Sequence, residues 1–134
     1  MLVHFPVAAW TVATSLALLA PWQDPGNSAA LVIVLARYSN GFGLATGVAA
    51  ILAGLVELTT LPADGRLRAA AARHLVLAVC AWFAYGFTWA LQVKHMLSAA
   101  AATGLIAFGL LVLAGHAGAR VVYHHGFPGR TETR

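Results

Sequence analysis

Four long apolar stretches make up most of this chain and limit what it can fold into. About 20 consecutive apolar residues cross a bilayer core as a helix, and four stretches are of about this length: residues 5–20, 41–61, 69–91 and 98–123. Only 9% of the residues are charged and 60% are hydrophobic, whereas soluble domains carry roughly a quarter charged residues. We therefore predict an all-α fold, an integral membrane four-helix bundle formed as one domain by residues 1–134.

One further apolar segment is too short to cross a membrane. Residues 28–38 include five consecutive aliphatic residues and precede the second span. Ser39, Asn40 and Gly41 form a weak point between the two, because small and polar residues favour helix ends and turns. We expect this segment either to lie in the membrane interface or to extend the second helix outward.

The basic residues predict how the spans are oriented. Alternating spans place both ends of the chain and the 61–73 loop on one side, which carries six arginines: Arg66, Arg68, Arg73, Arg120, Arg130 and Arg134. The other side carries Arg37 and Lys94. The positive-inside rule therefore predicts that both termini are cytoplasmic. Because the positions of the basic residues are explained by membrane topology, they do not indicate nucleic-acid binding. We expect the chain to contact a lipid bilayer and no nucleic acid.

Four ionisable side chains are predicted at this cytoplasmic end, one on each span: His4, Glu57, His74 and His125. Ionisable groups within spans are costly and usually functional. On its span, each of these residues lies at three- and four-residue steps from small or weakly polar residues, and so on the same helix face. Small and weakly polar residues favour close helix packing in membranes. We therefore expect all four groups to face the bundle interior.

These spacings predict the inward face of every span. The predicted inward positions of the first span are His4, Ala8, Thr11 and Ser15. Those of the second are Gly43, Gly47, Ala50, Gly54 and Glu57. Those of the third are His74, Ala78, Ala81, Tyr85 and Thr88, and those of the fourth are Gly104, Phe108, Leu111, Gly115, Gly118, Val122 and His125. Cys80, the single cysteine, is expected to be buried, and His95, His116 and His124 are not expected to belong to a site.

Three segments resemble a known family. The opening Leu2–Pro6, the segment Gly54–Leu58 and the ending Val121–Gly126 resemble the bacterial four-helix membrane family called domain of unknown function 2231. Members typically have a V-H-F-P start, an acid late in helix two, a histidine early in helix three and a final V-Y-x-H-G motif. The resemblance covers nearly the whole chain, although Arg120 stands where an acid is common. It implies a multi-pass protein of the bacterial cytoplasmic (inner) membrane, and fusions to electron-transfer modules suggest a redox setting.

By this resemblance the family positions are His4, Glu57, His74 and His125. A b-type haem needs two histidines that face each other across the ring. We favour His74 with His125 as ligands and keep His4 as the alternative. The residues expected to give the ring space or to meet its propionates are Gly115, Gly118, Arg73 and Arg120, together with Arg66 and Arg68. Such a haem would pass electrons between a quinone pool or partner subunit and another redox centre of a membrane complex.

Two other interpretations remain open. His4, Glu57, His74 and His125 would together make a four-coordinate site for zinc, iron or copper, or a proton relay. Alternatively, the chain is a cofactor-free accessory subunit that packs against a larger complex through its Gly43/Gly47 face, with Glu57 paired to Arg73 or Arg120. The sequence has no nucleophile–base pair or phosphate-binding loop, so independent catalytic activity is not expected.

Overall fold

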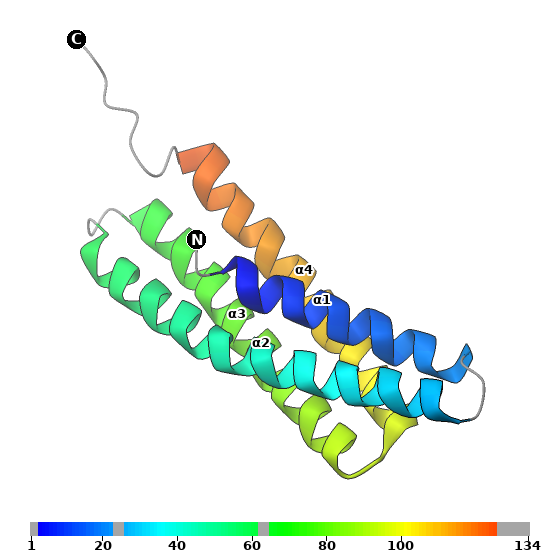
Figure 1. Cartoon of the computed structure of the whole chain (residues 1–134). Coiled ribbons are helices and arrows are strands. Elements are labelled where there is room, and N and C mark those ends of the chain that lie inside the picture. The colour runs from blue at the N-terminus through cyan, green and yellow to red at the C-terminus, as the bar shows by residue number, and fades with distance from the viewer. Residues whose placement is uncertain (1–2, 23–25, 62–64, 126–134) are drawn as a thin grey trace.

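Four long helices make up most of the described part of the chain (Figure 1). The computed structural model describes residues 3–22, 26–61 and 65–125, apart from the side chains of Asn27, His124 and His125. The helices are α1 (His4–Leu19), α2 (Asn27–Thr60), α3 (Gly65–Val93) and α4 (Leu97–His125), with a short 3-10 helix η1 (Ala20–Trp22) after α1. Each of the four long helices is long and apolar enough to cross a membrane. In the described ranges there is no strand, and the predicted all-α membrane bundle is confirmed.

Helix α2 is continuous through the segment that the sequence left ambiguous. Residues 28–38 extend the second span outward, so the helical alternative is correct. The polar residues of the expected weak point bond to neighbouring helices and do not interrupt the helix. The Ser39 hydroxyl donates to the Ala9 carbonyl at 2.8 Å, and Asn40 is fully buried.

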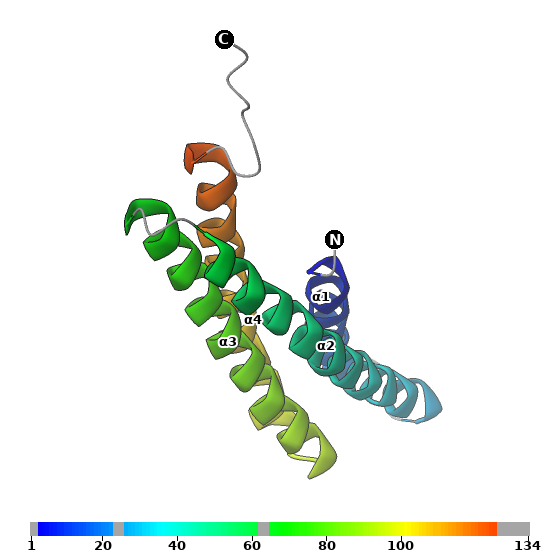
Figure 2. The same cartoon turned by 90° about the vertical axis from the view of Figure 1, so that its left-hand side faces the viewer.

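The helices associate as two antiparallel pairs, α1 with α2 and α3 with α4, and the pairs cross obliquely (Figure 2). A core cluster at the crossing contains Trp10, Tyr85 and Ala107, with partly buried residues around it. The Trp10 and Tyr85 rings are stacked, with centroids 4.6 Å apart and planes inclined by 2°. The crossing is therefore a closely packed core of the described structure.

Two glycines of α2 make room for the indole rings at the crossing. A Cβ added at Gly43 would lie 2.5 Å from Trp10 Nε1, and one added at Gly47 would lie 2.8 Å from Trp82 Cδ1. The Trp82 indole also donates to the Leu44 carbonyl at 2.9 Å. Small residues at these positions thus let two tryptophans lie against the α2 backbone, in keeping with small residues at membrane helix interfaces.

The predicted inward face of α1 was wrong. His4, Ala8, Thr11 and Ser15 are exposed, whereas the buried positions of α1 are Pro6, Ala9, Trp10, Ala13 and Thr14. At the interface between α1 and α2, the small residues belong to α2. The large side chain that fills the space beside them is Trp10 of α1. The exposed Thr11 satisfies its hydroxyl by donating to the Val7 carbonyl at 2.8 Å, so it needs no partner on another helix.

The prediction for α3 holds at its centre but not for the cysteine. Ala81, Tyr85 and Thr88 are buried as expected. Cys80 is exposed, because one residue along a helix turns the side chain by about 100° and Ala81 occupies the inward position. The outer face also exposes large apolar side chains such as Phe83 and Phe87, as expected of a surface in contact with acyl chains.

Candidate functional site

A cavity of about 640 Å³ opens between the helices at the end where α1 begins and α2 ends. Helix α1 has 16 residues, whereas α2 has 34, so α1 lies beside only part of α2 (Figure 1). Beside the first turns of α1, α4 separates from α2 toward its own C-terminal end (Figure 1). Val3, which precedes α1, and Pro6, Val7 and Trp10 of α1 border the cavity, and the other walls come mainly from α2, α3 and α4.

Small residues make up much of the cavity wall. They are Gly47, Ala50, Ala53, Gly54, Ala71, Ala78, Ala114 and Gly115. Gly47 and Gly54 lie against Trp82 and Leu75, whereas no neighbouring side chain lies within 4 Å of the position that a Cβ would take at Gly115. The volume is therefore left unfilled on the Gly115 side of the cavity. A space of this size lies within the range of about 300–1,000 Å³ that is typical of small-molecule and cofactor sites.

His74 is the best-defined polar group of the cavity. Its Nδ1 lies 2.8 Å from the Ala114 carbonyl oxygen of α4, and the ring packs on Gly118, where an added Cβ would lie 3.0 Å from two ring atoms. A carbonyl oxygen only accepts hydrogen bonds, so Nδ1 must carry a hydrogen. In the neutral ring this leaves the Nε2 lone pair for a hydrogen-bond donor or a metal.

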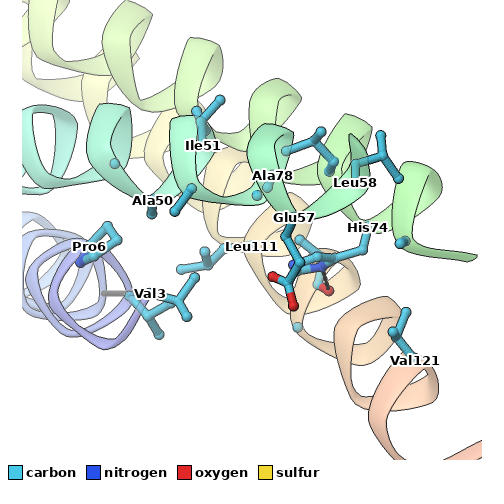
Figure 3. Close-up of a pocket in the computed structure, with 18 of the residues that line it drawn as sticks. Val3, Pro6, Ala50, Ile51, Glu57, Leu58, His74, Ala78, Leu111 and Val121 are labelled. Carbon is cyan, nitrogen blue, oxygen red and sulfur yellow. Dashed lines mark hydrogen bonds between the residues drawn. The ribbon is translucent and has the colours of Figure 1, made fainter. Parts of the chain in front are cut away.

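Glu57 is the second ionisable residue that lines the cavity. It projects from α2 into the space that His74 borders from α3 (Figure 3). The side chain is exposed rather than buried, and within the described structure no hydrogen bond joins its carboxylate to the His74 ring. Among the side chains that the structure describes, the cavity thus presents one carboxylate and one oriented imidazole within walls that are otherwise mainly apolar.

The structure brings together only some of the residues predicted for the site. Glu57, His74 and Gly115 line the cavity, and Gly118 contacts the His74 ring. His4 is exposed and does not line the cavity. The backbone of His125 ends α4, but its side chain lies outside the description, so its predicted role as a ligand stays a prediction.

The predicted cationic residues lie away from the cavity wall. Arg73 and Arg120 are exposed and do not line the cavity, and Arg73 donates from Nε to its own helix at the Ala69 carbonyl, 3.2 Å away. In the part of the chain that the structure describes, no three histidine, cysteine, aspartate or glutamate side chains gather as metal ligands would. The four-residue metal site therefore gains no support from the described residues.

Sequence reasoning missed several residues of the cavity. Pro6 and Trp10 line it, and their four-residue spacing on one helix face was a signal that could have been recognised. Leu111 also lines it and was expected only as an inward residue. The Ala114 carbonyl that orients His74 left no signal, because any residue type can present a backbone oxygen.

Comparisons with known proteins agree with this architecture. Searches of curated proteins and of solved structures found no match. A family model described as "Predicted membrane protein (DUF2231)" matches residues 1–129. This match takes in the cavity-lining parts of all four helices, Glu57 and His74 included. The chain therefore belongs to DUF2231, a family of predicted membrane proteins.

Proposed function

We propose that the cavity binds a b-type haem and that the His74 imidazole is one of its iron ligands. The hydrogen bond from His74 Nδ1 to the Ala114 carbonyl carries this proposal. Histidines that bind metals usually donate their other ring N–H to a carbonyl or carboxylate, which fixes the ring and its tautomer. His74 has this arrangement on the wall of a large, mainly apolar cavity.

The lining supports a flat, bulky, apolar group better than a small polar substrate. Gly115 borders the cavity, and no atom lies within 4 Å of the position a Cβ would take there. Ala78 and Ala114 add little bulk near His74. Helix bundles commonly build cofactor sites from facing helices in this way.

For the second iron ligand the proposal keeps the sequence prediction of His125, with His4 as the alternative. His125 ends α4, the helix that also supplies the Ala114 carbonyl, and α1 begins at His4 beside the cavity mouth. Arg73 and Arg120 are proposed to act on the haem propionates only from the rim, since neither lines the cavity.

A bound haem supplies one-electron redox chemistry. In this chain His74 would hold the group, and the apolar walls would keep water from it. We propose that the protein transfers electrons within a complex of the bacterial inner membrane, exchanging them with quinone or a partner subunit. The basic residues near the cavity end, Arg66, Arg68 and Arg73 among them, favour a cytoplasmic location for that end.

The absorption spectrum of the purified protein tests the proposal. We expect a Soret band in protein purified from cells supplied with a haem precursor, and loss of most of it in His74→Ala. His116→Ala is the matched control, because His116 is exposed and does not line the cavity. A wild-type protein without pigment refutes the haem proposal. A band that survives in His74→Ala refutes the ligand assignment, and His125→Ala and His4→Ala then test the other ligands.

A proton-relay or non-haem metal site is the second candidate. The observation in its favour is that Glu57 and His74 face one cavity in a membrane span, where ionisable groups are costly without a role. Elemental analysis of colourless protein for zinc, iron and copper tests the metal version. If the protein is both colourless and free of metal, the proton relay and the accessory-subunit interpretation remain. A proton-flux measurement in vesicles separates them, because only a relay should lose flux in Glu57→Gln.

A further inference from the structure

A second, much smaller cavity lies among buried residues at the helix crossing. Its volume is about 10 Å³, and its polar lining residues are Thr14, Asn40, Tyr85, Thr88 and Gln92. It shares no lining residue with the larger cavity, so nothing inferred from it depends on the proposed function. About 10–15 Å³ is the minimum volume that one water molecule requires.

Asn40 places an oxygen atom without a hydrogen-bond partner in this region. Its side chain is fully buried, and no described group bonds to its Oδ1. The Nδ2 atom donates to the Tyr85 carbonyl at 3.3 Å and to Gln92 Oε1 at 3.2 Å. Because the Tyr85 carbonyl can only accept, the amide cannot be turned to place its oxygen there, and Oδ1 needs a donor from elsewhere.

The hydroxyl pair across the cavity has one hydrogen to spare. Thr14 Oγ1 and Tyr85 Oη lie 3.0 Å apart, and either atom can be the donor. Two hydroxyls that share one hydrogen bond use one of their two hydrogens, so the other is free to donate. The cavity is thus bordered by an acceptor in need of a hydrogen and by a donor with one available.

We propose that a single water molecule is bound in this cavity, donating to Asn40 Oδ1 and accepting from the Thr14–Tyr85 hydroxyl pair. Buried waters typically make two to four hydrogen bonds to polar groups that are otherwise unsatisfied. This water links α1, α2 and α3 where the two helix pairs cross. Leaving Oδ1 without a partner in an apolar interior carries a large free-energy penalty, which the water removes.

The lining favours water over a metal cation. Among the described residues, no carboxylate lines the cavity, and a cation there would have only their neutral oxygens to replace its hydration shell. Moving an uncompensated charge into an apolar interior costs far more than moving a neutral molecule. The ligand is therefore a neutral donor and acceptor of the size of one water.

A crystal structure of the full chain, grown from a lipid phase at a resolution that shows ordered waters, tests the proposal. We expect a density peak about 2.7–3.0 Å from Asn40 Oδ1 and within hydrogen-bond reach of Thr14 or Tyr85. An empty position beside Oδ1, in a map that shows waters at the helix ends, overturns it. Crystals grown with rubidium give the cation test, because an anomalous peak at the position would identify an ion and also overturn the proposal.

Two neighbouring substitutions on α2 identify the group that holds the water. Asn40→Leu removes the acceptor, and we expect the peak to be lost. Ser39→Ala is the matched control, because Ser39 bonds to α1 but does not line the small cavity, and the peak should stay. A peak that persists in Asn40→Leu contradicts the assignment of Asn40. Should that variant fail to fold, the map of the unaltered protein decides.

Discussion

Small residues have opposite effects on packing at the helix crossing and at the open end of this bundle, which is the end that contains the larger cavity. At the crossing, Gly43 and Gly47 lie against indole rings, and Trp10 and Tyr85 stack in the core. At the open end, Gly115 has no atom within 4 Å of its Cβ position and borders a cavity of about 640 Å³. A small residue therefore gives close packing only where another helix supplies a large side chain to fill the space.

This comparison predicts that the crossing carries most of the stability of the tertiary structure. Trp10→Ala should destabilise the folded protein by about 3 kcal/mol, the lower end for deleting a buried large aromatic side chain, because Trp10 is only 4% exposed. Trp22→Ala is the control, since Trp22 is 84% exposed, and it should have little effect. Unfolding in mixed micelles measures both. Equal effects of the two substitutions would show that the crossing is not the packed core.

Matched glycine substitutions separate the two regions directly. Gly43→Ala should cost about 1–3 kcal/mol, typical of overpacking a filled interior, because the added methyl group would lie 2.5 Å from Trp10 Nε1. Gly115→Ala should not destabilise the protein, because nothing lies near its Cβ position. The same unfolding experiment compares them. A loss of stability in Gly115→Ala larger than that in Gly43→Ala would reverse the assignment of packed and open regions.

The polar contacts at the crossing should contribute less than the aromatic packing. Thr14→Val removes the hydroxyl that bonds to Tyr85, and we expect a loss of about 0.6 kcal/mol, the average for hydrogen bonds between membrane helices. Thr11→Val is the control on the same helix, because Thr11 is exposed and bonds only to its own backbone. A larger loss in the control would indicate that an unrecognised partner covers that face of α1.

The smallest effect is expected on the outer surface. Cys80 is exposed, so Cys80→Ala should change stability by less than about 0.5 kcal/mol, as is usual for surface positions. In the unaltered protein, a lipid-soluble carbene reagent activated by light should label the Cys80 face of α3 in intact membranes, because carbene insertion, unlike thiol alkylation, does not need a thiolate. A strongly destabilised variant, or protection from the lipid-soluble reagent, would show that another protein or a second copy covers this face.

The sequence predicted the helices and spans because these depend on local length and composition. It also identified the buried positions Ala81, Tyr85 and Thr88 on α3, since these residues recur there at three- and four-residue steps. It misidentified the inward face of α1, because small residues were taken as the interior and Trp10 was not. At a helix interface one helix supplies the glycines and the other supplies the indole ring. Which helix has which role depends on how the helices pack against each other, and the pattern of a single helix does not show this.

The candidate site was predictable only in part. Glu57 and His74 stood out as ionisable residues in apolar spans, and both line one cavity. The exclusion of His4 from the wall depends on where α1 begins relative to α2, which is a property of the assembled helices. The Ala114 carbonyl and the Asn40 oxygen could not be singled out either, because their importance comes from what surrounds them in three dimensions.

The unequal lengths of α1 and α2 have a consequence for their tilt in the membrane. At about 1.5 Å per residue, the 34 residues of α2 extend about 51 Å and the 16 of α1 about 24 Å, against a hydrocarbon thickness of about 30 Å. An upright α2 would protrude from the bilayer, whereas α1 with η1 (His4–Trp22, 19 residues) is of about the length needed to cross it. Hydrophobic mismatch of this kind is relieved by tilting the longer helix, so a bilayer that matches α1 should hold α2 tilted from the membrane normal.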